Sequence, residues 1–210
     1  MKSFQILPDK KFLAKVTPVI VNALKECEKI ITPKKKVQII VSPTSDAFVT
    51  KKMGGSSGIT QSGTLINISI NPSAKTWKAA LYSTVAHEFN HAVREQHFNQ
   101  YKNWNCALLD NIANEGLAQC FEEHITGITP LWAKAISKTL AKKLWKKIQN
   151  ILKKKSYENY KKVFYGYNGF PAWGGYTLAY LIVKQKVEET NYDWKKLAKM
   201  NSKNLIGNGL

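Results

Sequence analysis

The sequence has almost no arginine, although it is strongly basic. It contains 32 lysines and arginines against 14 aspartates and glutamates, for a net charge of +18, and Arg94 is its single arginine. A charge of this size first suggests a nucleic-acid partner. However, the guanidinium groups that recognise phosphate and guanine bidentately are missing. The composition therefore favours a lysine-rich surface over nucleic-acid recognition and leaves attraction to acidic partners open.

Paired cysteines and long apolar runs are also absent. Cys27, Cys106 and Cys120 form no C-x-x-C pair, which argues against a thiolate zinc cluster or a thioredoxin-type redox site. We expect these cysteines to be reduced and buried.

No apolar run reaches the roughly 18 residues that a membrane span needs. The first residues carry charge where a signal peptide needs an apolar core. We therefore expect a cytoplasmic protein without a transmembrane segment.

In the first third of the chain the pattern predicts one helix and two strands. Apolar residues at helical spacing predict a helix over residues 10–30, which Pro18 bends or delays. Short apolar runs predict a buried strand at 37–43 and a half-exposed strand at 64–71. The glycine- and serine-rich stretch 51–63 is expected to be a loop that could cover a cleft.

From residue 73 onward the pattern is mainly helical. Ser73 is the expected N-cap of a helix that includes residues 77–89. Further elements are expected as follows: helices over 104–126 (ending near Gly127), 130–155, 176–189 and 194–200, with an irregular aromatic-rich loop over 164–175. Strands followed by helices are typical of the α+β class. We expect one domain over 1–210, with a helix and a small sheet in 1–72 and a helical part in 73–210.

Three of the four histidines lie in the stretch "AHEFNHAVREQH", residues 86–97. His87 and His91 are one helical turn apart on the same face, so both imidazoles can bind one Zn²⁺. Glu88 lies one position further around the helix, where it can reach a water on the metal rather than the metal itself. The flanking residues are apolar, and unpaired histidine and glutamate would be costly in a buried helix. The sequence therefore predicts a zinc site with Glu88 as general base.

The third zinc ligand has two main candidates. His97 has the spacing of the metzincin pattern H-E-x-x-H-x-x-G-x-x-H, but Arg94 stands where that pattern ends the helix with glycine. On a continuing helix, His97 lies about 240° around from His91 and faces away from the metal. Glu115 lies on the next expected helix among apolar and small residues, where a carboxylate needs a cation. We therefore expect Glu115 to complete the site, with Glu122 on the same face as an alternative ligand or a supporting group.

These motifs resemble a known group of enzymes. H-E-x-x-H followed by N-E-x-x-A resembles the gluzincin zinc metallopeptidases. The stretches "VAHEFNHAVR", "NEGLAQCF" and "PAWGGYTLAYLIVKQKV" resemble a bacterial domain-of-unknown-function family of predicted Zn-dependent proteases, over about residues 36–187. The resemblance implies a zincin-like fold. Gluzincins often orient a zinc histidine with an aspartate four residues after the glutamate ligand. Here that residue is Gln119, which would accept the same hydrogen bond without a charge.

The expected function is zinc-dependent hydrolysis of peptide bonds in a peptide or protein substrate. Three protein ligands leave one position for water, and Glu88 would accept its proton. Tyr176 follows two glycines at a helix start and is the expected hydrogen-bond donor to the oxyanion. Its rivals are Tyr165, Tyr167 and Tyr180.

Two further expectations concern the partners of the protein. The resemblance implies that the strand over 64–71 is an edge strand that pairs with extended substrate through main-chain hydrogen bonds. The alternative function is a basic nucleic-acid-associated protein with a structural or vestigial zinc site, including a protease that acts on DNA-bound regulators.

Overall fold

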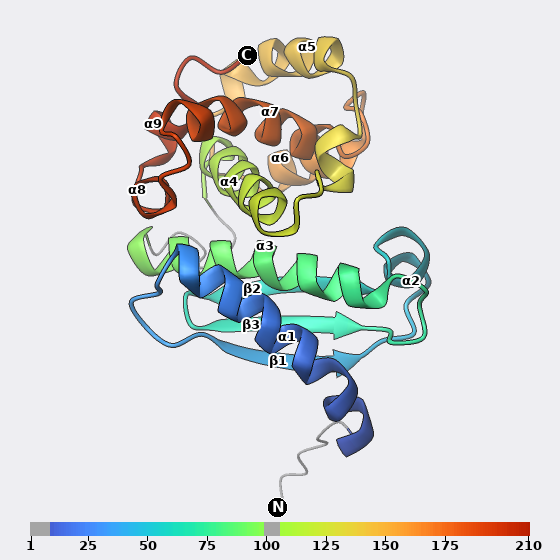
Figure 1. Cartoon of the computed structure of the whole chain (residues 1–210). Coiled ribbons are helices and arrows are strands. Elements are labelled where there is room, and N and C mark those ends of the chain that lie inside the picture. Colours follow the sequence, from blue (N-terminus) through green and yellow to red (C-terminus); the bar gives the residue numbers. More distant parts are fainter. Residues whose placement is uncertain (1–8, 99–105) are drawn as a thin grey trace, which may run out of the picture.

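The computed structural model describes residues 9–98 and 106–210, and its elements form two layers (Figure 1). The first layer contains α1 (Lys10–Ile30), a small sheet, α2 (Ala47–Lys52) and α3 (Trp77–Phe98). The second layer is helical: α4 (Leu108–Thr126), η2 (Leu131–Lys134), α5 (Lys138–Ile148), η3 (Gln149–Ile151), α6 (Tyr157–Lys161), η4 (Lys162–Gly166), α7 (Gly174–Glu189), α8 (Trp194–Ala198) and α9 (Ser202–Ile206). This arrangement confirms the predicted α+β class.

The sheet has the strand order β1-β3-β2, with β1 (Gln38–Pro43), β2 (Ser56–Ser62) and β3 (Leu65–Ile70). β3 runs parallel to β1 and antiparallel to β2. Buried and half-buried residues alternate along β3, as the sequence pattern predicted.

Two expectations about the sheet are wrong. The stretch 51–63 is not a loop, because β2 occupies most of it and the end of α2 lies in it. β2 pairs with β3 along its length and packs against α3, and these contacts outweigh its low content of β-branched residues. The strand predicted over 64–71 is not an edge strand, because β3 lies between β1 and β2.

Helix α3 lies between two hydrophobic cores. On one side Leu81, Val85 and Ala92 join the core formed by α1 and the isoleucines of β3. On the other side Phe89 and Val93 join the core of the second layer. Because both sides are covered, α3 is buried along most of its length, as the apolar residues around its histidines predicted. The cysteines are also buried: Cys27, Cys106 and Cys120.

Several helix boundaries differ from the prediction. α1 is one helix over its whole length, with Pro18 inside it. α3 begins at Trp77 rather than after Ser73, because residues 71–76 form turns. α4 begins at Leu108, and Trp104, the predicted start, lies outside the described residues. α4 ends where predicted, because Gly127 adopts the left-handed conformation (φ 69°) of a C-cap.

The helix predicted over residues 130–155 is divided into η2, α5 and η3. The Thr177 hydroxyl donates to the Trp132 carbonyl at 2.9 Å and accepts from the Ile136 N–H at 3.3 Å. The Ser137 hydroxyl then caps α5. These bonds satisfy the backbone where the helix is interrupted.

The last part of the chain is more helical than expected. The predicted aromatic loop is partly the π-helix η4, the predicted helices over 176–189 and 194–200 correspond to α7 and α8, and α9 was not predicted. Within the part of the chain that the structure describes, no helix is long and apolar enough to cross a bilayer.

Candidate metal centre

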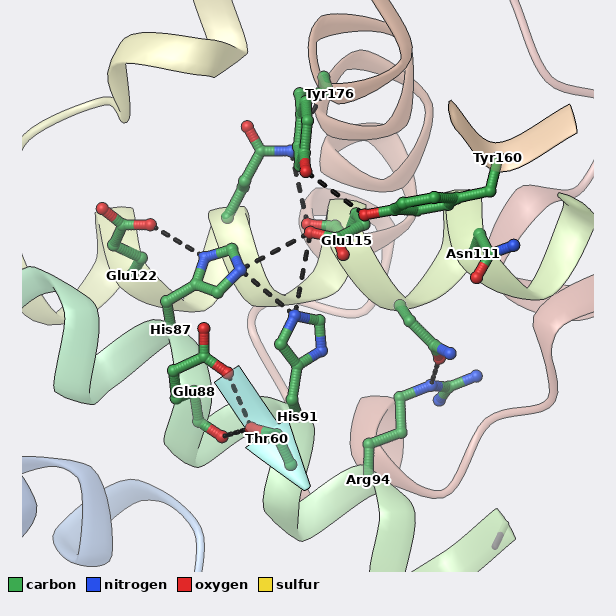
Figure 2. Close-up of polar contacts among 12 residues, drawn as sticks. Thr60, His87, Glu88, His91, Arg94, Asn111, Glu115, Glu122, Tyr160 and Tyr176 are labelled. Atoms are coloured by element: carbon green, nitrogen blue, oxygen red, sulfur yellow. Dashed lines mark hydrogen bonds and ion pairs between the residues drawn. The ribbon is translucent and has the colours of Figure 1, made fainter. Parts of the chain in front are cut away.

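Helix α3 brings His87 and His91 together on one face (Figure 2). Their Nε2 atoms are 3.1 Å apart and their ring centroids are 4.8 Å apart. The helix continues through both residues, so one turn of backbone fixes their relative position. His91 is almost fully buried, whereas the His87 side chain keeps 18% of its surface exposed. The pair therefore lies at the wall of a cleft rather than deep in the core.

Helix α4 places Glu115 opposite the two histidines. Its Oε2 lies 3.5 Å from Nε2 of His87 and 3.7 Å from Nε2 of His91. The neighbouring Gly116 lets α4 and α7 pack closely, because a Cβ there would overlap the backbone of Ala179 on α7. The structure thus brings together the three residues that the sequence singled out, from two helices.

The three donor atoms have the chemistry and the spacing of a zinc site. Two imidazole nitrogens and one carboxylate oxygen are ligands that Zn²⁺ accepts. Zinc bonds of about 2.0–2.2 Å in tetrahedral geometry separate neighbouring ligand atoms by roughly 3.3 Å. The observed separations of 3.1, 3.5 and 3.7 Å bracket that value. Among the described residues, His87, His91 and Glu115 are the one cluster of histidine, cysteine or acidic side chains close enough together to hold a metal ion.

Glu122 orients the ring of His87. Its Oε2 lies 3.0 Å from Nδ1 of His87, and its Oε1 accepts a hydrogen bond of 2.5 Å from the Ser83 hydroxyl. When Nδ1 carries the proton for this bond, Nε2 keeps its lone pair for a metal. The supporting role considered for Glu122 fits this geometry.

Gln119 does not take the role expected for it. Its amide donates to the Tyr176 carbonyl at 2.9 Å and to the Glu115 carbonyl at 3.3 Å, and no bond to a histidine is found. Gln119 therefore connects α4 to the first turn of α7. The carboxylate that supports a histidine comes instead from Glu122, so the negative charge missing at position 119 is supplied three residues later.

The electrostatics of the trio favour a positive charge between its members. Burial would lower the pKa of His87, but the hydrogen bonds and charges of Glu115 and Glu122 raise that pKa well above its ordinary value. Burial would raise the pKa of Glu115, but His91 and His87 lower it to about 2. The carboxylate is therefore ionised and faces imidazoles that its charge polarises, which suits a bound cation.

Glu88 lies on the side of α3 that faces β2. The Thr60 hydroxyl donates to Oε2 of Glu88 at 2.7 Å and lies 3.0 Å from the Glu88 backbone carbonyl. Gly58 leaves room for the glutamate, because a Cβ there would lie 2.5 Å from Cγ of Glu88. Sequence analysis missed both residues, since they lie in the stretch that was expected to be a loop.

A cavity of about 1000 Å³ opens over the trio and Glu88. Tyr176 lines it together with Tyr160, and their hydroxyl oxygens are 3.2 Å apart (Figure 2). Burial and then the charge of Glu115 raise the pKa of both tyrosines well above its ordinary value, so both hydroxyls keep their protons.

The rival tyrosines are placed differently. Tyr165 lines the same cavity, whereas Tyr167 donates to Glu158 and Tyr180 donates to Glu123, both away from the trio. Sequence analysis did not consider Tyr160, although the spacing of Tyr157, Tyr160 and Phe164 is helical and could have placed them on one aromatic face.

His97 is not part of the trio. α3 continues to Phe98, as the absence of the metzincin glycine predicted, so His97 lies in the last helical turn. Burial and the charges of Lys34, Lys199 and Arg94 lower the pKa of His97. These positive neighbours make the surroundings of His97 unfavourable for a cation. The fourth histidine, His124, stacks on Tyr192 elsewhere on the surface.

Arg94, the single arginine, is fully buried and has a structural rather than a nucleic-acid-binding environment. Its Nε donates to Oδ1 of Asn114 at 2.5 Å, and another nitrogen donates to the Met200 carbonyl at 2.8 Å. Arg94 thus connects α3 to α4 and to the chain before α9. Because α3 and α4 carry the trio, this connection also helps to fix the distance between the two helices that carry it.

The chain is mainly helical with a small sheet, and it carries H-E-x-x-H on one helix and a glutamate opposite it on the next. This donor arrangement is similar to that of gluzincin-type metallopeptidases, as the sequence motifs suggested. The chain belongs to the family described as Predicted Zn-dependent protease (DUF2268), whose model matches residues 17–207. The resemblance inferred from the three sequence motifs is thereby confirmed. Comparisons with curated proteins and with solved structures found no match.

Proposed function

We propose that the protein is a zinc-dependent peptidase in which His87, His91 and Glu115 bind the metal. The observation that carries this proposal is the spacing of the three donor atoms, which lie 3.1–3.7 Å apart on the wall of a cleft. The family description supports the same reaction class. The exposed part of His87 leaves the site open to the cleft. This openness suits a catalytic zinc, which keeps one position for water.

Bound zinc would polarise the substrate carbonyl and make a water more acidic. The chain itself supplies the base: Glu88 accepts the proton of the attacking water and returns it to the leaving amine. The Thr60 hydroxyl holds the Glu88 carboxylate from β2 and leaves its other oxygen for the water. Thr60 is therefore a positioning residue in this proposal.

Tyr176 and Tyr160 supply the donors for the oxyanion. Both hydroxyls line the cleft, and they hydrogen-bond to each other. Because each hydroxyl has one proton, one of them can donate to its neighbour while the other donates into the cleft. The Gln119 bond to the Tyr176 backbone fixes the turn that carries this tyrosine. The pair would thus present a prearranged donor to the developing negative charge.

The substrate backbone would pair with β2. β2 is an edge strand in the order β1-β3-β2, and Ser56, Ser57, Gly58, Ile59 and Thr60 all line the cleft. An extended peptide can add to such an edge through main-chain hydrogen bonds. This role therefore moves from the strand predicted over 64–71 to the neighbouring strand.

The test is Glu88→Gln, measured for both zinc content and cleavage of fluorescence-quenched peptides. We expect one zinc per chain in wild type and variant, with cleavage reduced at least about a thousandfold in the variant, because the base is lost while the ligands remain. Glu123→Gln is the matched control, since Glu123 does not line the cleft and its carboxylate bonds to Tyr180, Lys184 and Thr129 rather than to the trio.

Two results would contradict the proposal. One is full cleavage by Glu88→Gln. The other is salt-sensitive retention on DNA or RNA that chelators do not affect, together with no cleavage by wild type, which would favour the nucleic-acid alternative.

A further inference from the structure

Exposed apolar side chains concentrate around the cleft. Ten large hydrophobic residues are exposed among those that the structure describes, and five of them line this one cavity: Phe48, Ile59, Ile128, Leu131 and Tyr165. Single exposed apolar residues are common on protein surfaces, but a contiguous group around a cavity marks a binding surface. The cleft therefore offers apolar area beyond the metal site itself.

Aromatic rings connect the metal site to this apolar surface. Trp173 lies 6.1 Å from Tyr176, measured between ring centroids, and 4.4 Å from Trp132. Phe48 stacks on Trp132 at 6.4 Å and on Trp173 at 5.8 Å. Phe48 belongs to α2 in the first layer, whereas the two tryptophans belong to η2 and to the start of α7 in the second layer. We call Phe48, Trp132 and Trp173 the aromatic wall.

The backbone of Trp173 is strained in the conformation that builds the wall. Its φ is 57°, in the left-handed region that bulky L-residues rarely adopt. The Gly174 N–H donates to the Pro171 carbonyl and the Tyr176 N–H donates to the Trp173 carbonyl, which hold the turn in place. A strained backbone of this kind persists only where the surrounding structure maintains it, and such residues cluster at ligand sites. This observation is independent of the exposed apolar residues and points to the same end of the cleft.

The positive charge of the chain does not extend into the cleft. Lys52 is the only lysine or arginine among the described residues that line it, although the chain carries 32 such residues. Its carboxylates are Glu88, Glu115 and Glu122, all at the metal site, so the aromatic end of the cleft offers apolar and aromatic groups rather than charges for contacts with substrate.

We propose that the aromatic wall is a specificity subsite for a bulky apolar side chain, aromatic or branched aliphatic, next to the bond that is cleaved. The proposal rests on the proposed peptidase function and adds the class of substrate. Trp173 is the ring of the wall that lies next to Tyr176, the proposed donor to the oxyanion. A substrate side chain that contacts the wall therefore belongs to a residue directly beside the cleaved bond. Burial of a phenylalanine side chain favours such a peptide over its alanine counterpart about ten- to a hundredfold.

Two measurements with the same peptides test the subsite. The probes are fluorescein-labelled peptides of alternating glycine and alanine, with phenylalanine, alanine or lysine at one central position. Binding is measured by fluorescence polarisation on zinc-loaded Glu88→Gln, and cleavage is measured by mass spectrometry with wild type. The subsite variants are Trp132→Ala, which removes a ring of the wall, and Leu131→Ala, which removes the exposed cleft residue beside it in η2. Their matched controls are Tyr157→Ala and Leu140→Ala, which remove exposed residues of similar kind outside the cleft.

We expect the phenylalanine peptide to bind and to be cleaved at least about tenfold better than the other two, with the cut next to phenylalanine. Trp132→Ala and Leu131→Ala reduce this preference at least about threefold, and the controls retain it. Equal cleavage of all three peptides, or a preference that survives in both subsite variants, overturns the subsite and leaves the peptidase function intact. A binding preference without any cleavage supports the subsite and contradicts the peptidase function. If no peptide is cleaved and none binds in preference to the others, both the subsite and the peptidase function are overturned.

Discussion

The Thr60 hydroxyl on β2 donates a hydrogen bond of 2.7 Å to the Glu88 carboxylate on α3. Both residues are buried. The bond joins the edge strand of the sheet to the helix that carries the two histidines. The strand that would align the substrate is thereby coupled directly to the residue that would accept the proton of the attacking water.

Removing the Thr60 hydroxyl is therefore expected to reduce turnover without removing zinc. Thr60→Val keeps the volume of the side chain but leaves the Glu88 carboxylate without its donor, and a hydrogen bond to a charged group is worth about 1.5–3 kcal/mol. We expect kcat to fall about tenfold or more with little change in KM, measured by steady-state peptide cleavage. Thr60→Ser retains the hydroxyl and should stay close to wild type. Equal kcat in wild type and Thr60→Val would show that Thr60 does not position the base.

Glu122→Gln is expected to weaken zinc binding. The glutamine can still accept the Nδ1 proton of His87, but it removes the charge that makes this ring a better ligand, and such changes typically cost about 10–100-fold in affinity. The measurement is zinc competition against a fluorescent chelator. Glu123→Gln is the neighbouring control, because Glu123 contacts Lys184 and Tyr180 rather than a histidine. Unchanged zinc affinity in Glu122→Gln would contradict the supporting role.

A methyl group at position 58 is expected to displace Glu88, the proposed general base. In Gly58→Ala the new Cβ would lie 2.5 Å from Cγ of Glu88 and 2.8 Å from Cγ2 of Thr84, so one of the elements must shift. We expect a loss of turnover of tenfold or more, roughly the effect of a displacement near 1 Å, while zinc content stays at one per chain. Cleavage at the wild-type rate would show that the space around Glu88 is not critical.

Replacement of Arg94 is expected to destabilise the whole protein. Arg94→Met removes the hydrogen bonds that the buried guanidinium donates to the Asn114 side chain and to the Met200 carbonyl, and a hydrogen bond from a charged group is worth about 1.5–3 kcal/mol. We expect the free energy of unfolding to fall by about 2–4 kcal/mol in urea denaturation. Arg94→Lys should recover only part of this loss, because an ammonium group cannot donate in the same fork. Lys142→Met, at an exposed position of α5, should change stability by less than about 0.5 kcal/mol.

Local sequence patterns were sufficient to predict the two metal-facing helices. The histidine spacing on α3 depends only on helical periodicity, and Glu115 was distinguished by the small and apolar residues around it. The same reasoning predicted that α3 would continue past Arg94 and carry His97 away from the metal. These features are short in range, so the sequence contains them directly.

The residues that sequence analysis missed depend on contacts between distant segments. Gly58 and Thr60 lie in a glycine- and serine-rich stretch that has little tendency to form a strand, yet each has a specific contact with Glu88 in the folded chain. Tyr160 reaches the cleft only because α6 packs beside α4 and brings its hydroxyl to that of Tyr176 on α7. The supporting carboxylate comes from Glu122 rather than from position 119 because of which side of α4 faces His87, and the five-residue motif N-E-x-x-A does not specify this.

The central claim is that a glutamate from α4, and not the later histidine of α3, completes a metal site with His87 and His91. Zinc content after equilibration with a moderate chelator tests it most directly, in wild type, Glu115→Ala and His97→Ala. We expect one zinc per chain in wild type and in His97→Ala, and a loss of most of the zinc in Glu115→Ala. Full zinc in Glu115→Ala together with zinc loss in His97→Ala would contradict the ligand set.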